Sequence, residues 1–238
     1  MIVVAAGGGV RLGAGTPKAF APLCGEPLLA HALRGVLGCA EVGHVIVVAP
    51  ASHLRAAGEL AGDERRVQVV AGGADRAASV RAGLAALHPD DGIVLVHDAA
   101  RCLAPADLFA RVIHAVRAGH SAVVPGLAVT DTVKVVNAQG RVQATPDRDT
   151  LRAIQTPQGF LREVLEHAHA SGGHATDDAG LVERIGGHVL VVDGDPRAFK
   201  VTSSLDLAMA TALMAFKVTS TLDLAVATAL MQDGTHDK

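Results

Sequence analysis

The sequence predicts an α/β protein whose mostly parallel, twisted sheet carries helices on both faces. Three observations support this prediction: short runs rich in Val and Ile recur along the chain, Ala- and Leu-rich stretches with helical spacing separate them, and 50% of the 238 residues are hydrophobic. Alternating strands and helices favour parallel strands, because each helix carries the chain back across the sheet before the next strand begins. The length fits one domain with a substantial core.

Six apolar runs are predicted to be buried strands, because they are short, continuous and rich in β-branched residues. They occupy residues 2–6, 44–49, 67–71, 93–97, 121–125 and 188–193. Apolar residues recur with a helical period between them, in 27–37, 76–87 and 105–116. One region breaks this alternation: β-branched residues flank the turn signal NAQG between residues 131 and 154, which predicts a hairpin that projects from the sheet.

A glycine-rich segment, 5–20, follows the first strand, at the carboxyl edge where open α/β sheets bind ligands. Its glycines let backbone N–H groups approach a phosphate closely, and Arg11 and Lys18 add positive charge. The segment is not a dinucleotide fingerprint, because Leu12 stands where a glycine is required, and it is not a P-loop, because no Gly-Lys-Ser/Thr follows. Phosphate binding is favoured over a flexible connection with two solvated cations.

Two further segments follow strands. In 70–84 a second glycine pair opens a helix, whose start can hold an anion or a base edge, and ordinary helix capping explains this segment equally well. In 95–103 a strand ends in Asp98, with Arg101 three residues on. A carboxylate at that point can hold Mg²⁺ together with substrate phosphates. A capped turn in which Arg101 is the ion-pair partner of Asp98 is the alternative.

A fourth group of polar residues lies in the second half of the chain and could contact a polyol in a cleft. It comprises Arg148, Thr156 and the run Thr176, Asp177 and Asp178. The run precedes an apolar helical pattern, so helix capping is the favoured interpretation of that run taken alone.

The composition excludes several classes of function. A net charge of −3, from 21 basic and 24 acidic residues, is not typical of proteins that bind nucleic acids or anionic membranes. The N-terminal segment lacks the charged leader of a signal peptide and no apolar run reaches transmembrane length, so we expect a cytoplasmic protein. The three cysteines lack CxxC spacing and predict neither disulfides nor a zinc site.

A repeat lies near the C-terminus: residues 198–214 recur as 215–231, with threonine in place of Ser204 and valine in place of Met209. Two short copies do not indicate a solenoid, which needs at least three units. Each copy is predicted to form an amphipathic helix. In the first copy, the face expected to pack inward consists of Leu205, Ala208, Met209, Ala212 and Leu213.

Taken together, these segments resemble the 2-C-methyl-D-erythritol 4-phosphate cytidylyltransferase family of isoprenoid precursor synthesis. Eight short motifs keep the family's order and spacing over residues 1–211. They are Ala5-Ala6-Gly7-x-Gly9-x-Arg11-Leu12-Gly13 with Pro17-Lys18, Gly72-Gly73-x-Asp75-Arg76-x-x-Ser79-Val80, His97-Asp98-Ala99-Ala100-Arg101, Asp131-Thr132-Val133-Lys134, Asp147-Arg148, Thr156-Pro157-Gln158, Thr176-Asp177-Asp178, and Gly194-Asp195-x-Arg197-x-x-Lys200-Val201-Thr202.

The resemblance implies a Rossmann-like nucleotidyltransferase fold, with a cytidylyltransferase domain over 1–214, a dimerisation arm at 128–153 and a duplicated tail at 215–238. It also implies the reaction: a phosphate oxygen of methylerythritol 4-phosphate attacks the α-phosphate of CTP, pyrophosphate leaves, and 4-diphosphocytidyl-2-C-methylerythritol forms. A homodimer is implied as well, because in this family the arm crosses to a second subunit, where Arg148 serves the neighbouring site.

The resemblance also assigns roles to residues of this sequence. The catalytic cations would be Arg11, Lys18 and Lys200, with Mg²⁺ held at Asp98. The residues that bind CTP would be Ala5, Ala6, Gly7, Gly9, Gly73 and Ser79. The residues that bind methylerythritol phosphate would be Asp98, Arg101, Thr132, Arg148, Thr156 and Thr176. Lys217 in the second copy would be a spare, because only the first copy follows the family's lead-in at 194–197.

Two alternatives are open: a related enzyme with another substrate, and a binding protein without catalytic activity. A pentitol-phosphate cytidylyltransferase, such as one that makes CDP-ribitol from ribitol 5-phosphate, would share the loops that contact CTP and differ only at the residues that face the polyol. A catalytically silent nucleotide-binding sensor would need no set of cations around the phosphates. The joint presence of Arg11, Lys18 and Lys200 therefore favours an enzyme.

Overall fold

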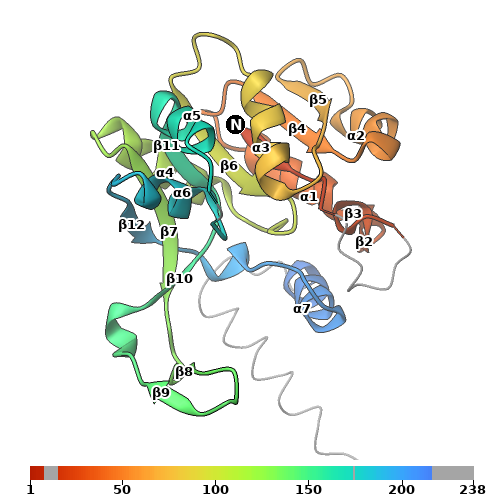
Figure 1. Cartoon of the computed structure of the whole chain (residues 1–238). Helices are drawn as coiled ribbons and strands as arrows, with labels where there is room; N and C mark the ends of the chain where they lie inside the picture. The colour runs from red at the N-terminus through yellow and green to blue at the C-terminus, as the bar shows by residue number, and fades with distance from the viewer. Residues whose placement is uncertain (8–15, 174, 216–238) are drawn as a thin grey trace, which may run out of the picture.

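A mixed sheet of eight strands forms the centre of the molecule, with helices packed on both of its faces (Figure 1). The computed structural model describes residues 1–7, 16–173 and 175–215. Its elements, in chain order, are β1 (Ile2–Val4), η2 (Lys18–Phe20), β2 (Pro22–Leu23), β3 (Glu26–Pro27), α1 (Leu28–Leu37), β4 (Val45–Ala49), η3 (Ala51–His53), α2 (Leu54–Ala61), β5 (Val67–Ala71), α3 (Arg76–Ala85), β6 (Ile93–Asp98), α4 (Ala106–Arg117), β7 (Ala122–Ala128), β8 (Val135–Val136), β9 (Val142–Ala144), η4 (Arg148–Thr150), β10 (Arg152–Ile154), β11 (Gln158–Leu161), α5 (Arg162–Ala170), α6 (Asp178–Arg184), β12 (Leu190–Asp193), η5 (Pro196–Ala198) and α7 (Ser204–Ala215).

The strand order of the sheet is β10-β7-β11-β6-β1-β4-β5, and β12 also pairs with β7. β1 lies between β4 and β6 and is parallel to both, while β4 is parallel to β5 and β7 to β12. β11 runs antiparallel to β6 and β7, and β10 runs antiparallel to β7. The chain moves outward from β1 to β5 and returns to β6 on the other side of β1. The strand order therefore reverses beside β1, which is where open α/β sheets bind ligands.

The side chains of the central strands alternate between two apolar cores, one on each face of the sheet. Ile2 packs with residues of α3, α5 and α6 on one face, and Val3 packs with residues of α1 and α4 on the other. Burial on both faces explains why these strands are continuously apolar in sequence. Among the described residues, no helix combines the length and the apolar character needed to span a bilayer.

The predicted fold class is confirmed: all six predicted strands exist, and the three predicted helices correspond to α1, α3 and α4. Strands β10 and β11 of the main sheet are not among the six predicted strands. In β11 the glycine at position 159 obscured the signal, because glycine is disfavoured within strands. The structure explains this glycine: a Cβ there would collide with Val112 of α4, which packs closely against the strand.

The predicted hairpin is present as β8 and β9, which form a separate two-stranded antiparallel sheet that extends away from the main sheet (Figure 1). Its NAQG turn is fixed by Asn137, whose side-chain oxygen accepts hydrogen bonds from the backbone of Gln139 and Arg141. Residues 152–154, which the prediction assigned to the hairpin, instead pair with the main sheet as β10.

Helix α7 corrects one prediction about the first copy of the repeat. The face expected to pack inward is wrong, because Leu205 is 69% exposed and Met209 is 42% exposed. The buried residue is Ala210, and Leu207 and Met214 pack beside it against the core. The helix is apolar almost all round, so its periodicity does not select one face. Residues 216–231 of the second copy lie outside the described residues.

Candidate active site

A cleft of about 290 Å³ opens at the carboxyl ends of β1, β5 and β6, beside the reversal of strand order. The three segments that sequence analysis placed after these strands converge there, and a lysine from the C-terminal region joins them. The predicted site residues that line the cleft are Ala5, Ala6, Gly7, Lys18, Gly73, Ser79, Asp98 and Lys200. The structure thus brings these residues together, and their roles in binding and catalysis stay predictions.

The loop after β5 forms one wall of the cleft. A Cβ on Gly73 would collide with Ala78, so only glycine fits this path of the backbone. The Gly73 N–H donates to the hydroxyl of buried Ser79 at 3.2 Å, and that hydroxyl donates to the carbonyl of Asp75 at 2.8 Å. Asp75 also caps α3 by accepting from the Ala78 N–H. The segment from Gly73 to Ser79 therefore both caps α3 and lines the cleft.

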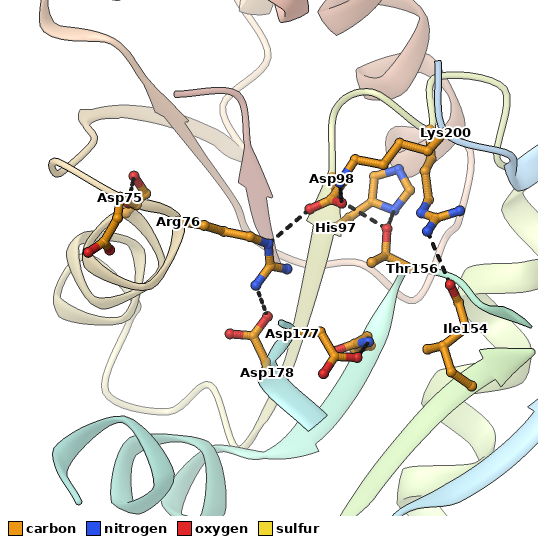
Figure 2. Close-up of polar contacts among 12 residues, drawn as sticks. Asp75, Arg76, His97, Asp98, Ile154, Thr156, Asp177, Asp178 and Lys200 are labelled. Atoms are coloured by element: carbon orange, nitrogen blue, oxygen red, sulfur yellow. Dashed lines mark hydrogen bonds and ion pairs between the residues drawn. The ribbon is translucent and has the colours of Figure 1, made fainter. Parts of the chain in front are cut away.

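Asp98 stands at the end of β6 between two cations that come from distant parts of the chain (Figure 2). Lys200 Nζ donates to its Oδ2 at 2.7 Å, and Arg76 Nε donates to its Oδ1 at 3.2 Å. Burial opposes ionisation, but Arg76, Lys200 and Arg101 outweigh it and hold the pKa of Asp98 well below its usual range. The two cations therefore favour the ionised form of this carboxyl group.

Thr156 and His97 support Asp98 from within the core. The backbone N–H of Asp98 donates to Thr156 Oγ1 at 3.1 Å, and that hydroxyl is hydrogen-bonded to His97 Nδ1 at 3.0 Å. Both side chains are buried. Thr156 thus lies directly behind the cleft, where its hydroxyl positions the end of β6, and its predicted contact with the polyol phosphate stays a prediction.

The other predicted polyol-phosphate residues lie outside the cleft lining. Arg101 donates to the carbonyl oxygens of Ala198 at 2.7 Å and Ile154 at 3.2 Å, so it ties the segment before Lys200 to the sheet. Thr132, Arg148 and Thr176 are exposed. The site roles assigned to Gly9 and Arg11 fall on positions outside the described residues.

Arg76 belongs to the second motif, but the sequence pattern did not predict a role for it. Arg76 lines the cleft, contacts Asp98, and donates through Nη1 to Asp178 at 2.7 Å. The available signal was an arginine directly after the helix cap Asp75, on a helix that begins at the cleft. The pattern could not identify its partners, because Asp178 is 102 residues away in the chain.

The ring of His97 should make folding stability depend on pH. Burial lowers its pKa from the ordinary 6.5 to about 4. Between these values the unfolded chain binds a proton that the folded chain excludes, so the free energy of unfolding should fall as pH falls from 6.5 to about 4, by about 3 kcal/mol in all. Above pH 6.5 this contribution should be constant.

His97→Asn tests this prediction, because the asparagine amide can still form a hydrogen bond with Thr156 but does not titrate. Urea unfolding at several pH values should show that the difference between wild type and variant shrinks or reverses as pH falls through this window. Parallel curves from pH 7 to pH 4 would contradict the assignment.

Comparisons with known proteins agree with this architecture. A family model described as 2-C-methyl-D-erythritol 4-phosphate cytidylyltransferase matches residues 1–216. A protein of that name from Nocardia farcinica is 53% identical over 213 residues, which cover 90% of this chain and 92% of the relative. Another from Saccharopolyspora erythraea is 52% identical over 219 residues, covering 90% and 98% of the two chains.

Solved structures are similar over the same extent. A 4-diphosphocytidyl-2C-methyl-D-erythritol synthase from Anaerococcus prevotii superposes with a TM-score of 0.80 at 30% identity, covering 90% of this chain and 96% of that one. A 2-C-methyl-D-erythritol 4-phosphate cytidylyltransferase from Thermus thermophilus gives a TM-score of 0.71 at 35% identity, covering 89% and 97%.

Proposed function

Because this chain belongs to the 2-C-methyl-D-erythritol 4-phosphate cytidylyltransferase family, it transfers CMP from CTP to 2-C-methyl-D-erythritol 4-phosphate, and we propose that the cleft around Asp98 carries this reaction with Mg²⁺. The products are 4-diphosphocytidyl-2-C-methylerythritol and pyrophosphate. The observation that carries the proposal is the position of Asp98, which lines the cleft together with Lys18 and Lys200 and contacts Lys200 directly.

The residues present fit a magnesium ion that arrives with the nucleotide. Mg²⁺ is usually held by one or two carboxylates together with substrate phosphates and water. No group of three or more His, Cys, Asp or Glu side chains that could hold a metal occurs within residues 1–7, 16–173 and 175–215. Asp98 would therefore be the ligand from the protein, with the phosphates supplying the others. The bound ion would neutralise charge on the phosphates of CTP.

The side chains of the cleft would act by position and charge. The phosphate of the second substrate has a pKa of about 6 for its last proton, so it is largely ionised at pH 7 and needs no general base. Lys18 and Lys200 would stabilise the negative charge that develops on the transferring phosphoryl group and the leaving pyrophosphate. The small residues Ala5, Ala6 and Gly73 would let the backbone approach cytosine, and Ser79 would keep the Gly73 loop in place.

We further propose a cytoplasmic homodimer assembled through the arm. The arm carries exposed apolar side chains that a second subunit could cover, namely Val133, Val135, Val136 and Val142. The three cysteines are free, as is usual in a reducing compartment. Arg148, whose guanidinium donates to the Thr130 carbonyl at 2.8 Å, would then lie at the cleft of the neighbouring subunit.

Mixing two inactive variants tests the shared site. Arg148→Ala should lower turnover, because the partner's polyol phosphate would lose a cation, and Lys18→Ala should be nearly inactive. In a mixed dimer, one site combines an intact cleft with an intact arm. We therefore expect mixtures of the two variants to regain part of the wild-type rate, up to about a quarter. Absence of any gain at every mixing ratio, with subunit exchange verified, would contradict the crossing arm.

The reaction itself can be followed by ³¹P NMR with CTP, methylerythritol 4-phosphate and Mg²⁺. We expect the phosphomonoester signal to be replaced by the two coupled signals of a diphosphate diester, together with pyrophosphate. EDTA should stop the reaction, and excess Mg²⁺ should restore it. Turnover at an unchanged rate in EDTA would overturn the proposed role of the metal.

A further inference from the structure

A series of contacts between charged side chains leads from Asp98 in the cleft through Arg76 to the buried residue Asp178 (Figure 2). Arg76 bridges two carboxylates: its Nε donates to Asp98 at 3.2 Å, and its Nη1 donates to Asp178 at 2.7 Å. His169 Nε2 lies 2.9 Å from the other oxygen of Asp178. The proposed reaction gives a role to Asp98 in this series of contacts, and none to Asp178 or His169.

Asp178 is the most deeply buried carboxylate of this set, with 1% of the residue exposed. A buried carboxylate is costly unless it is paired, so its presence needs an explanation beyond packing. Both of its oxygens are engaged, by Arg76 and by His169. Burial disfavours the charged form of Arg76, but Asp178 and Asp98 outweigh it and raise the pKa of the guanidinium. Arg76 therefore stays positively charged between these two acidic side chains.

The position of Asp178 is fixed by the start of α6. Gln158, a buried residue of β11, donates to the carboxylate of Asp177 at 2.7 Å and accepts from the Ala179 N–H at 3.1 Å. Asp177 caps the helix by accepting from the Gly180 N–H. Since β11 pairs directly with β6, which ends in Asp98, the sheet fixes the positions of Asp98 and Asp178 relative to each other.

We propose that Asp178 is a positioning residue for nucleotidyl transfer: it holds Arg76 so that the guanidinium fixes only one oxygen of Asp98. The other oxygen then stays available to Lys200 and to a metal carried by the nucleotide. Without Asp178, the planar guanidinium of Arg76 would be free to take both oxygens of Asp98 in a bidentate pair, which is its preferred geometry with a carboxylate. This inference rests on the proposed role of Asp98 as the magnesium ligand.

Asp178→Asn tests it with almost no change in volume. The amide can still accept from His169, but its NH₂ group cannot accept from Arg76. We expect the magnesium concentration for half-maximal rate to rise about 10-fold and kcat to fall by a similar factor, the usual effect of losing a partner that orients a metal ligand. Titration calorimetry of CTP without the polyol phosphate should show weaker binding than wild type in Mg²⁺ and equal binding in EDTA.

A second carboxylate of α6 provides a matched control. Glu183→Gln makes the same change from carboxylate to amide on this helix, at an exposed side chain that takes no part in holding Arg76. We expect it to leave the magnesium dependence unchanged. Thermal melts of all variants report any loss of folded protein separately. A lower melting temperature for Asp178→Asn, with wild-type magnesium dependence and kcat, would reduce Asp178 to a structural role and overturn the inference.

A double mutant shows whether Asp178 acts through Arg76. If it does, adding Asp178→Asn to Arg76→Ala should change kcat by less than about 2-fold further, because the link is already broken. Independent, multiplying effects would overturn the inference. Failure of the proposed function would be visible separately: wild type would then show no magnesium-dependent turnover, whereas failure of this inference alone leaves wild type active and Asp178→Asn indistinguishable from it.

Discussion

Lys200→Ala should lower kcat by about 1,000-fold while the protein stays folded. The expected loss reflects removal of a positive charge that acts on the transferring phosphoryl group, and single preorganised donors of this kind contribute about 100- to 1,000-fold. The fold should survive because Asp98 keeps its contact with Arg76, and the buried neighbour Val201 still donates its N–H to Ala100. Pyrophosphate release and circular dichroism measure the two effects.

The duplicated tail supplies the matched control, Lys217→Ala, because Lys200 and Lys217 stand in the same local sequence, AFKVTS. Only Lys200 follows the anchored lead-in: Gln155 exchanges two hydrogen bonds of 2.9 Å with the backbone of Asp195, and Arg101 holds the Ala198 carbonyl. We expect Lys217→Ala to keep wild-type activity.

A chain that stops after Met214 should also be folded and active, because it keeps Lys200 and the residues Leu207, Ala210 and Met214 with which α7 packs.

The second copy could in principle replace the first. The two copies differ at Ser204 and Met209, both exposed in the first copy, so the second copy retains the residue types with which the first copy packs. If Lys200→Ala stayed active and the double variant with Lys217→Ala did not, the second copy would be able to replace the first, and the assignment of a single working lysine would be wrong.

Lys18→Ala should lower kcat by at least about 100-fold, with a smaller change in the KM for CTP. Its side chain lines the cleft at the start of η2, whose short turn is held by backbone hydrogen bonds from Phe20 to Pro17 and from Ala21 to Lys18. These bonds do not depend on the lysine side chain, so the melting temperature should change little.

Arg55→Ala is a suitable comparison for Lys18→Ala. It also removes one positive charge, but from the exposed surface of α2, where Arg55 forms an ion pair with Glu59. Its rate should equal that of wild type. If both variants lost activity to a similar degree, a general loss of positive charge rather than the position of Lys18 would explain the effect.

The sequence predicted most of the sheet, because buried central strands and crossover helices leave strong local patterns. It predicted the cleft for the same reason: Asp98 and the glycine pair at 72–73 directly follow recognisable strands. Because ligands of open α/β sheets bind at the carboxyl edge of the strands, these residues could be assigned to one site. Elements with weak local signals were missed or misread, such as β11 with Gly159 and the nearly all-apolar helix α7.

The contacts that organise the cleft could not be predicted, because they join residues far apart in the chain. Arg76 reaches Asp98 and Asp178, which are 22 and 102 residues away. Nor could sequence patterns show that Thr156 is buried behind Asp98 rather than lining the cleft. Such pairings arise from strand order and register, which no single segment encodes.

The most direct test of the account compares the two polyol phosphates under identical conditions. Pyrophosphate release is measured with CTP and Mg²⁺ held saturating, while either 2-C-methyl-D-erythritol 4-phosphate or ribitol 5-phosphate is varied. The account predicts that kcat/KM for methylerythritol phosphate exceeds that for ribitol phosphate by at least about 100-fold, since a site built to pair with one set of hydroxyls leaves groups unpaired with another. Equal or faster turnover of ribitol 5-phosphate would contradict it.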